Sequence, residues 1–173
     1  METTSKLHPG QRFARETYRR LDGPDFDFGG TGRWQTLFVI RGQHCPICKR
    51  YLTALDAARS EFDELGIEIA AVSADSEAQT RIMAEACTPG FPLLYGMGEA
   101  MMQRLGLYVS EPTSSGETDH RFPEPALFVV NSDGRLQIVD VTNAPFVRPD
   151  LETLLGGLRF IIAKDYPIRG THR

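Results

Sequence analysis

The feature that most constrains the fold is a continuous apolar stretch, TLFVIRG, at residues 36–42. An apolar run of this length without polar alternation is typical of a strand that is buried on both faces of its sheet. Helical spacing replaces it after Pro46, with apolar residues at Cys48, Leu52, Leu55, Phe62 and Leu65. Gly66 is expected to end this helix. A buried strand that leads straight into a helix indicates an α/β fold.

The rest of the chain continues the alternation of strands and helices. We predict strands at 67–75 and 91–96, helices at 76–86, 98–107 and 150–163, and a β-hairpin at 126–141. Residues 109–124 are expected to form a polar loop at the rim of an active site. The order β-α-β followed by β-β-α predicts a thioredoxin-like fold, in which helices flank both faces of a central mixed sheet. A helix–strand–helix segment, 76–107, is inserted between the two halves.

Two features argue against other α/β folds. A flavodoxin-like or Rossmann sheet shares the alternation, but it would carry a glycine-rich phosphate loop near a strand end. The sequence has no such loop, and it places a hairpin near its end. The thioredoxin-like fold is therefore favoured.

Composition limits the partners and the location. The 173 residues suit a single domain spanning 1–173, and the net charge of −4 provides no electrostatic footprint for nucleic acid or an anionic membrane. No apolar run approaches the roughly 18 residues that span a bilayer. The start, METTSKLHPGQRFARETYRR, lacks the apolar region of a secretory signal. We expect a cytoplasmic protein, whose thiols are kept reduced.

The stretch HCPICKR places Cys45 and Cys48 where the strand gives way to the helix. Free amide N–H groups and the helix dipole favour a negative charge at this point, so the thiolate of Cys45 should be stabilised. Pro46 suits the first helical position because its missing N–H is not needed there. Arg41 adds a positive charge nearby, and His44 adds another when protonated. These residues form the candidate site.

The two cysteines are predicted to differ. Cys48 lies on the apolar face of the helix, so it should be the more buried thiol with the higher pKa. Cys45 lies beyond the helix end and should be exposed. This asymmetry favours Cys45 as the attacking thiol and Cys48 as the resolving one. The spacing predicts a disulfide between them, with Cys87 left free as a small core residue.

Two alternatives remain beside redox chemistry. A structural zinc site has four ligands, and one CxxC pair supplies two of them. Cys87, His44 and His120 could complete the set. The pair could also be merely structural. Because a second CxxC and paired histidines are both missing, we expect neither a metal nor another cofactor. A redox-active pair is favoured.

The segment RGQHCPICKRYLTAL resembles the RG-x-x-CP-x-C-x-x-x-L-x-x-L active-site segment of peroxiredoxin-like proteins in the alkyl hydroperoxide reductase and thiol-specific antioxidant (AhpC/TSA) family. The resemblance continues through AAVSAD, LGLYVS and EPALFVVNSDGRL to PFVRPDL. It implies the thioredoxin fold and an antioxidant oxidoreductase. It also implies that Pro125 is a cis-proline beside the cysteines, where it would expose backbone groups to a substrate.

The chain departs from true peroxiredoxins at three positions. Gly42 stands where they carry threonine or serine, Phe38 where they carry proline, and Pro125 where they carry an activating arginine. Peroxide cleavage needs donors on the peroxide oxygens. Without the usual donors, we expect slow peroxide oxidation unless Arg41 or Arg121 substitutes.

These departures order the functional hypotheses. The first is a thiol-disulfide oxidoreductase in cell redox homeostasis that cycles Cys45 and Cys48. The second is a thiol peroxidase in which Cys45 becomes a sulfenic acid. The third is a non-catalytic binding module.

The partners expected are a disulfide or peroxide substrate and a thiol reductant of the thioredoxin or glutathione type. The resemblance also allows a homodimer. Three polar residues are expected to be solvated surface near the site rather than part of it: Tyr108, His120 and Arg148.

Overall fold

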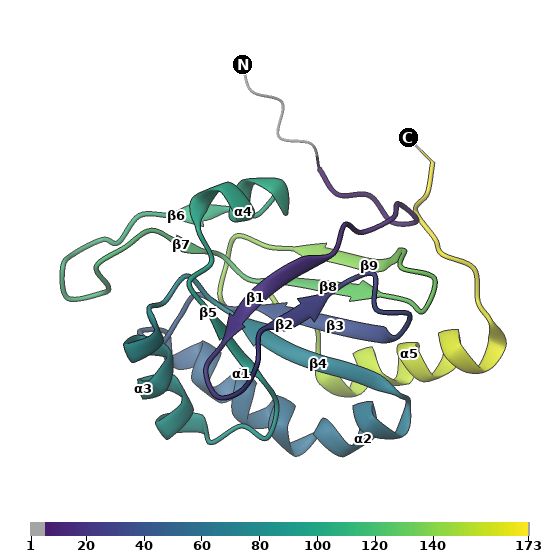
Figure 1. The fold of residues 1–173 in the computed structure, drawn as a ribbon, viewed down its shortest axis with the longest axis horizontal. Coiled ribbons are helices and arrows are strands. Elements are labelled where there is room, and N and C mark those ends of the chain that lie inside the picture. The colour runs from purple at the N-terminus through teal and green to yellow at the C-terminus, as the bar shows by residue number, and fades with distance from the viewer. Residues whose placement is uncertain (1–5, 173) are drawn as a thin grey trace.

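A seven-stranded mixed sheet forms the centre of the computed structural model, which describes residues 6–172 (Figure 1). The strand order is β2-β1-β5-β4-β3-β8-β9. The strands are β1 (Glu16–Arg20), β2 (Phe26–Phe28), β3 (Trp34–Val39), β4 (Ile67–Val72), β5 (Leu93–Tyr95), β8 (Ala126–Val130) and β9 (Leu136–Val141). The central strand β3 runs parallel to β4 and antiparallel to β8. This arrangement confirms the predicted thioredoxin-like fold.

Helices cover both faces of the sheet. In Figure 1, α1 (Pro46–Ala57), α2 (Arg59–Glu64), α3 (Glu77–Cys87) and α5 (Leu151–Lys164) lie below it, and α4 (Glu99–Arg104) lies above. The lower helices share one apolar core that includes Leu52, Phe62 and Leu155. A second core, with Phe28 and Met102, fills the opposite side. Within residues 6–172, no helix combines the length and apolarity that crossing a membrane requires.

The predicted elements differ from the observed ones in three places. The helix expected from Pro46 to Gly66 is broken at Ala58, which separates α1 from α2. The hairpin of β1 and β2, at the edge of the sheet, was not predicted. The loop expected at 109–124 contains two short paired strands, β6 (Val109–Ser110) and β7 (Phe122–Pro123). The inserted segment α3-β5-α4 is present as predicted.

The topology brings distant residues to one edge of the sheet. Because β3, β4 and β5 are parallel, their carboxyl ends meet at the same edge, and the antiparallel β8 begins there. The loop leading to Cys45 follows β3, Asp75 follows β4, and Glu124 precedes β8. Ligand and active sites of open α/β sheets lie at such an edge.

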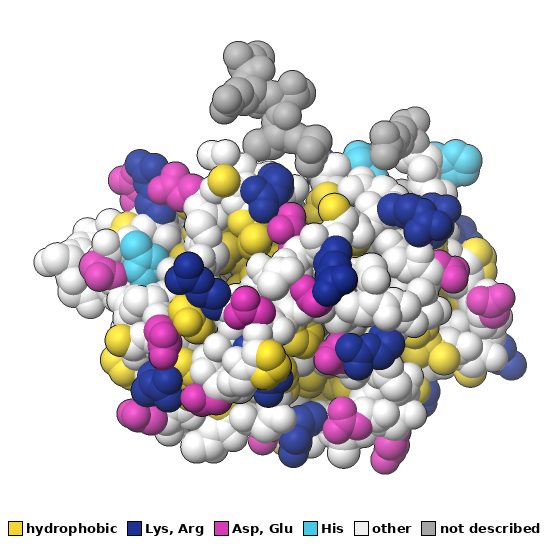
Figure 2. All heavy atoms as spheres, viewed as in Figure 1, with side chains coloured by type: hydrophobic (Ala, Val, Ile, Leu, Met, Phe, Trp, Pro, Cys, Tyr) yellow, Lys and Arg dark blue, Asp and Glu magenta, His cyan; other side chains and the backbone are white. Residues whose placement is uncertain are grey.

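Charges are mixed over the face that Figure 2 displays. Lysine and arginine side chains alternate with aspartate and glutamate over that face, with no single-sign patch standing out. This distribution agrees with the small net charge of −4.

Candidate active site

Cys45 is the N-cap residue of α1, at the point where the loop after β3 enters the helix. Its backbone N–H donates to the carbonyl of Gly42 at 3.1 Å, and its Sγ accepts the backbone N–H of Cys48 at 3.2 Å. Pro46 occupies the first helical position, as expected. The local sequence therefore aims the sulfur of Cys45 at the N-terminus of a helix, where negative charge is favoured.

Cys45 is only 2% exposed, so the prediction that it would be the exposed thiol is wrong. Its pKa is nevertheless lowered to about 6, chiefly because the Cys48 side chain hydrogen-bonds to it. The backbone N–H of Cys48 and the charges of Arg148 and Arg41 act in the same direction, while burial opposes them. At neutral pH, Cys45 is therefore a buried thiolate.

Cys48 differs sharply from its neighbour. It is fully buried, and burial is the main cause that raises the pKa of its thiol, followed by the hydrogen bond to Cys45. The predicted asymmetry of the two pKa values is thus present: burial raises the pKa of Cys48, as expected, whereas hydrogen bonding rather than exposure lowers that of Cys45. All three cysteines are free thiols in this structure. The disulfide between Cys45 and Cys48 stays a prediction.

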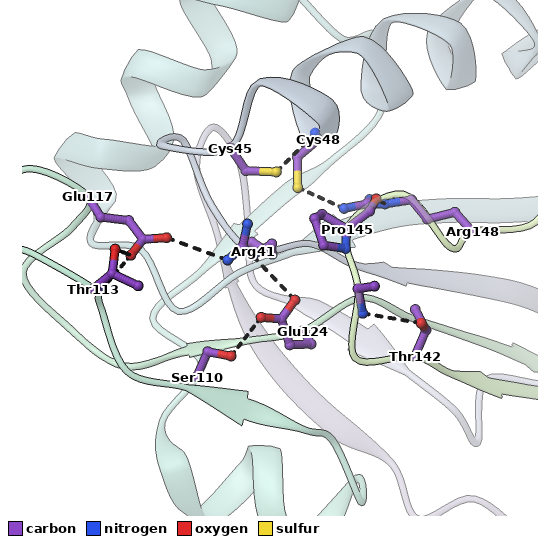
Figure 3. Close-up of polar contacts among 11 residues, drawn as sticks. Arg41, Cys45, Cys48, Ser110, Thr113, Glu117, Glu124, Thr142, Pro145 and Arg148 are labelled. Atoms are coloured by element: carbon purple, nitrogen blue, oxygen red, sulfur yellow. Dashed lines mark hydrogen bonds and ion pairs between the residues drawn. The ribbon is translucent and has the colours of Figure 1, made fainter.

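Arg148 reaches the site from the segment before α5 (Figure 3). Its Nη2 donates to the Sγ of Cys48 at 2.8 Å, and its Nε donates to the carbonyl of Pro145 at 2.8 Å. The guanidinium also lies 5.1 Å from the ring centre of Tyr51. The prediction that Arg148 is solvated surface is wrong, because this segment folds back over the start of α1.

Arg41 approaches from the other side, at the end of β3 (Figure 3). Its guanidinium pairs with two carboxylates, Glu124 at 3.3 Å and Glu117 at 3.5 Å. Glu124 is 5% exposed and also accepts the hydroxyl of Ser110 at 2.6 Å. The guanidinium packs over Phe122, 4.7 Å from the ring centre. Arg41 is thus close to the cysteines, as predicted, but its charge is largely balanced.

His44 does not supply the positive charge that the sequence suggested. Burial and the nearby Arg41 lower its pKa, so the imidazole is neutral at physiological pH. Its ring packs against Phe122 at 4.6 Å, and both ring nitrogens are buried without a hydrogen-bond partner. His44 therefore acts as a neutral ring that packs the active-site loop against Phe122.

Pro125 does not have the expected cis peptide bond. The Glu124–Pro125 bond is trans, and the carbonyl of Pro125 accepts the backbone N–H of Thr142 at 3.0 Å. The backbone edge that was expected to receive a substrate is therefore already paired within the protein. Pro125 instead lines a small, mainly apolar pocket together with Tyr51 and Arg148.

The other candidates lie apart from the cysteine pair. Arg121 pairs with Glu99 and Glu111 on the surface, so the prediction that it could replace a peroxide donor is not supported. Cys87 is 7% exposed, and its thiol donates to the carbonyl of Lys49 at 3.5 Å behind α1. Within residues 6–172, no group of three or more histidine, cysteine or acidic side chains is arranged to hold a metal ion.

Sequence reasoning missed the role of Arg148 and the contact of Asp75 with the loop before Cys45, in which the Asp75 carboxylate accepts the N–H of Gln43 at 2.7 Å. Arg148 did stand in the motif PFVRPDL, a charged residue between apolar ones. That pattern was a usable signal. Nothing in the sequence near Asp75 indicated its contact.

Comparison with protein families identifies one match. Residues 21–139, more than half of the chain, match the model described as the AhpC/TSA family. No curated protein sequence matches the chain significantly.

Several solved structures that are similar to this chain in fold are peroxiredoxins or peroxiredoxin-like proteins. A cysteine-to-serine mutant of peroxiredoxin 6 from Arenicola marina has a TM-score of 0.76 at 18% identity, covering 88% of this chain and 72% of its own. A peroxiredoxin-like protein from Aquifex aeolicus has a TM-score of 0.73 at 16% identity, covering 90% and 88%. Reduced Prx3 from Vibrio vulnificus, in complex with H2O2, has a TM-score of 0.71 at 19% identity, covering 88% and 99%.

Proposed function

This chain belongs to the AhpC/TSA family of thiol-dependent oxidoreductases, and from that premise we propose that it is a thiol peroxidase that reduces hydrogen peroxide or an organic hydroperoxide through Cys45. The sequence analysis placed disulfide exchange first and peroxide reduction second. The family match and the geometry of the site support the reverse order.

One observation carries the proposal: the sulfur of Cys45 caps α1 and accepts the N–H of Cys48 in a site where the residue is 2% exposed, and its pKa is lowered to about 6. A peroxide is small enough to reach a sulfur with so little accessible surface, whereas a disulfide in a folded protein needs the sulfur to protrude. The trans bond before Pro125 points the same way, because the carbonyl of Pro125 is already occupied by Thr142. A non-catalytic binding module would have no use for a thiol whose pKa is lowered to about 6.

The proposed chemistry has three steps. The Cys45 thiolate attacks one peroxide oxygen, the O–O bond breaks, and the leaving oxygen takes a proton to become water or an alcohol, so that Cys45 becomes a sulfenic acid. The Cys48 thiol then attacks the sulfur of Cys45 and releases water, which forms the disulfide. An external thiol reductant returns both cysteines to the reduced state by exchange.

The donors for the first step come from this chain's own arginines. The usual threonine position is Gly42 and the usual arginine position is Pro125, so neither supplies a donor. Arg148 already donates to the sulfur of Cys48 and adds positive charge beside Cys45. It is therefore the best-placed group to stabilise negative charge on the leaving oxygen. Arg41 contributes less, because Glu117 and Glu124 balance its charge.

The reductant is a further part of the proposal. Attack on the disulfide requires a thiol partner, and we expect one of the thioredoxin or glutathione type. The cytoplasm, where thiols are kept reduced, is the proposed location.

The intermediate provides the test. Reduced Cys48→Ser protein is mixed with hydrogen peroxide and dimedone, which labels sulfenic acids, and the labelled peptide is identified by mass spectrometry. The proposal expects the label on Cys45 in this variant, a Cys45–Cys48 disulfide in the unmodified protein, and neither in Cys45→Ser. If Cys45 is not labelled but still exchanges with protein disulfides, thiol-disulfide exchange becomes the favoured function again.

A further inference from the structure

Asp75 lies at the edge of the sheet where the cysteines lie, and two hydrogen bonds of its backbone fix its position. It follows β4 and is 1% exposed. Its backbone N–H donates to the hydroxyl of Ser73 at 3.2 Å, and its carbonyl accepts the N–H of Gly96 at 2.8 Å. These two contacts fix the point from which the carboxylate extends towards the loop before α1.

The carboxylate of Asp75 contacts the loop that delivers Cys45. Its Oδ2 accepts the backbone N–H of Gln43 at 2.7 Å. A Cβ atom on Gly42 would lie 2.5 Å from its Oδ1, and the φ of Gly42 is +135°, a conformation that L side chains rarely adopt. The carboxylate therefore occupies the space that a side chain at residue 42 would need. This explains why glycine stands three residues before the reactive cysteine.

The same loop fixes the position of the sulfur. The carbonyl of Gly42 accepts the N–H of Cys45, so residues 42–45 form a tight turn that is anchored to Asp75 through Gln43. The turn places Cys45 at the N-cap, where it meets the N–H of Cys48. Without the carboxylate, the N–H of Gln43 loses its acceptor and the turn loses its only side-chain anchor among the described residues.

The charge of Asp75 acts in the opposite direction. A negative charge on Asp75 would disfavour a second negative charge on Cys45, so by charge alone it would raise the pKa of that thiol. Burial raises the pKa of Asp75 itself, which weakens this charge effect. His120 lies 3.4 Å from Oδ1 of Asp75, and Asp119 contacts the other ring nitrogen of His120 at 2.8 Å. Positioning and charge thus predict opposite effects when Asp75 is replaced.

We propose that Asp75 is a positioning residue for the nucleophile: its carboxylate takes the place of a side chain at residue 42 and holds the 42–45 turn so that Cys45 caps α1. The inference rests on the proposed function only in taking Cys45 as the nucleophile. Asp75 need not touch the substrate.

The test measures the thiolate of Cys45 without any peroxide. The rate of iodoacetamide alkylation of the Cys45 peptide is followed against pH in Asp75→Ala, Asp75→Asn and the control Asp119→Asn. Asp75→Ala should raise the apparent pKa of Cys45 by about one unit, which slows alkylation about twofold at pH 7 and about tenfold at pH 5. Asp75→Asn keeps an oxygen acceptor for Gln43, so it should restore the pKa to the unmodified value or below. Asp119→Asn should leave it unchanged.

Two outcomes would overturn the proposal. If both Asp75 variants lower the pKa of Cys45, only the charge matters; if both melt at lower temperature with an unchanged pKa, the role is structural alone. Should Asp75→Ala not fold, amide hydrogen exchange of the unmodified protein decides instead. The Gln43 N–H should exchange far more slowly than the exposed loop amides, and fast exchange would contradict the anchor. If the protein proves not to be a peroxidase, these measurements still test the role of Asp75, because they use no peroxide.

Discussion

Two arginines approach the cysteine pair from opposite sides, and their surroundings differ. Arg41, at the end of β3, is paired with Glu117 and Glu124 and stacked on Phe122. Arg148, before α5, donates to the sulfur of Cys48 and to one backbone carbonyl, with no carboxylate within ion-pair distance in the described part of the chain. The first arginine belongs to a balanced ion-pair network, whereas the second has a charge that is not balanced by a carboxylate.

This difference indicates how the site can act without the usual donors. A guanidinium that already pairs with two carboxylates gains little by turning to a peroxide, since the buried Glu124 would lose its ion pair. A guanidinium whose hydrogen bonds go only to a sulfur and a carbonyl can donate to a developing negative charge at small cost. We therefore assign catalysis mainly to Arg148 and stability mainly to Arg41.

Replacing Cys45 should give the largest effect, and it tests the premise that Cys45 is the nucleophile on which both arginines act. Cys45→Ser should abolish reductant-coupled peroxide consumption, because no other thiol is a thiolate at neutral pH. Cys87→Ser is the matched control and should keep full activity, since burial raises the pKa of Cys87 and it lies behind α1. Steady-state peroxide consumption measures both. Residual turnover in Cys45→Ser would mean that the wrong sulfur has been chosen.

Replacing Arg148 should give the next largest effect. Arg148→Met should slow the oxidation of Cys45 by about 10²–10³-fold, the usual loss when one donor to a developing oxyanion is removed. Arg148→Lys keeps the charge without the planar donor pair, so its oxidation rate should lie between those of the unmodified protein and Arg148→Met. Stopped-flow oxidation with a thermal melt for each variant separates rate from stability. An unchanged rate in Arg148→Met would remove the contrast between the arginines.

The pH dependence of Cys45 oxidation also distinguishes the two arginines. The pKa of Cys45 is lowered to about 6, so the rate of peroxide oxidation should be constant above neutral pH and fall about tenfold per unit below pH 6. Because Arg148 favours the thiolate more than Arg41 does, Arg148→Met should move this midpoint to higher pH by more than Arg41→Met. Equal shifts in the two variants would contradict the assignment.

Arg41 should affect the rate least and the stability most. Arg41→Met leaves the buried Glu124 without its partner, which should destabilise the fold by about 3 kcal/mol while changing the oxidation rate less than tenfold. The double variant Arg41→Met with Glu124→Gln should recover much of the stability, because the buried charge at residue 124 is then removed together with its partner. Urea unfolding measures both variants. A rate loss like that of Arg148→Met without a stability loss would reverse the roles.

The local geometry of the site could be predicted from the sequence. The apolar run before Cys45, the proline after it and the helical spacing beyond place a cysteine at a helix N-cap, as the structure has it. The thioredoxin-like order of elements followed from the same kind of pattern. These features depend on residues that are neighbours along the chain.

Contacts from distant segments could not be predicted. Arg148 is 100 residues from Cys48, and Asp75 is 32 residues from Gln43, yet each is hydrogen-bonded to the other residue of its pair. Gly42 was interpreted only as a missing donor, because nothing near it in the sequence indicated that a carboxylate fills its side-chain space. The expectation of a cis bond at Pro125 came from the resemblance alone, and the bond is trans.

The most direct test of the account is the rate at which hydrogen peroxide oxidises the reduced protein. Stopped-flow measurement at neutral pH would compare it with a small-molecule thiolate and with exchange between the protein and a model protein disulfide. The account predicts oxidation at least about a hundredfold faster than that of the free thiolate, through donation by Arg148, and faster than the exchange reaction. Oxidation within tenfold of the free thiolate, together with faster disulfide exchange, would contradict it.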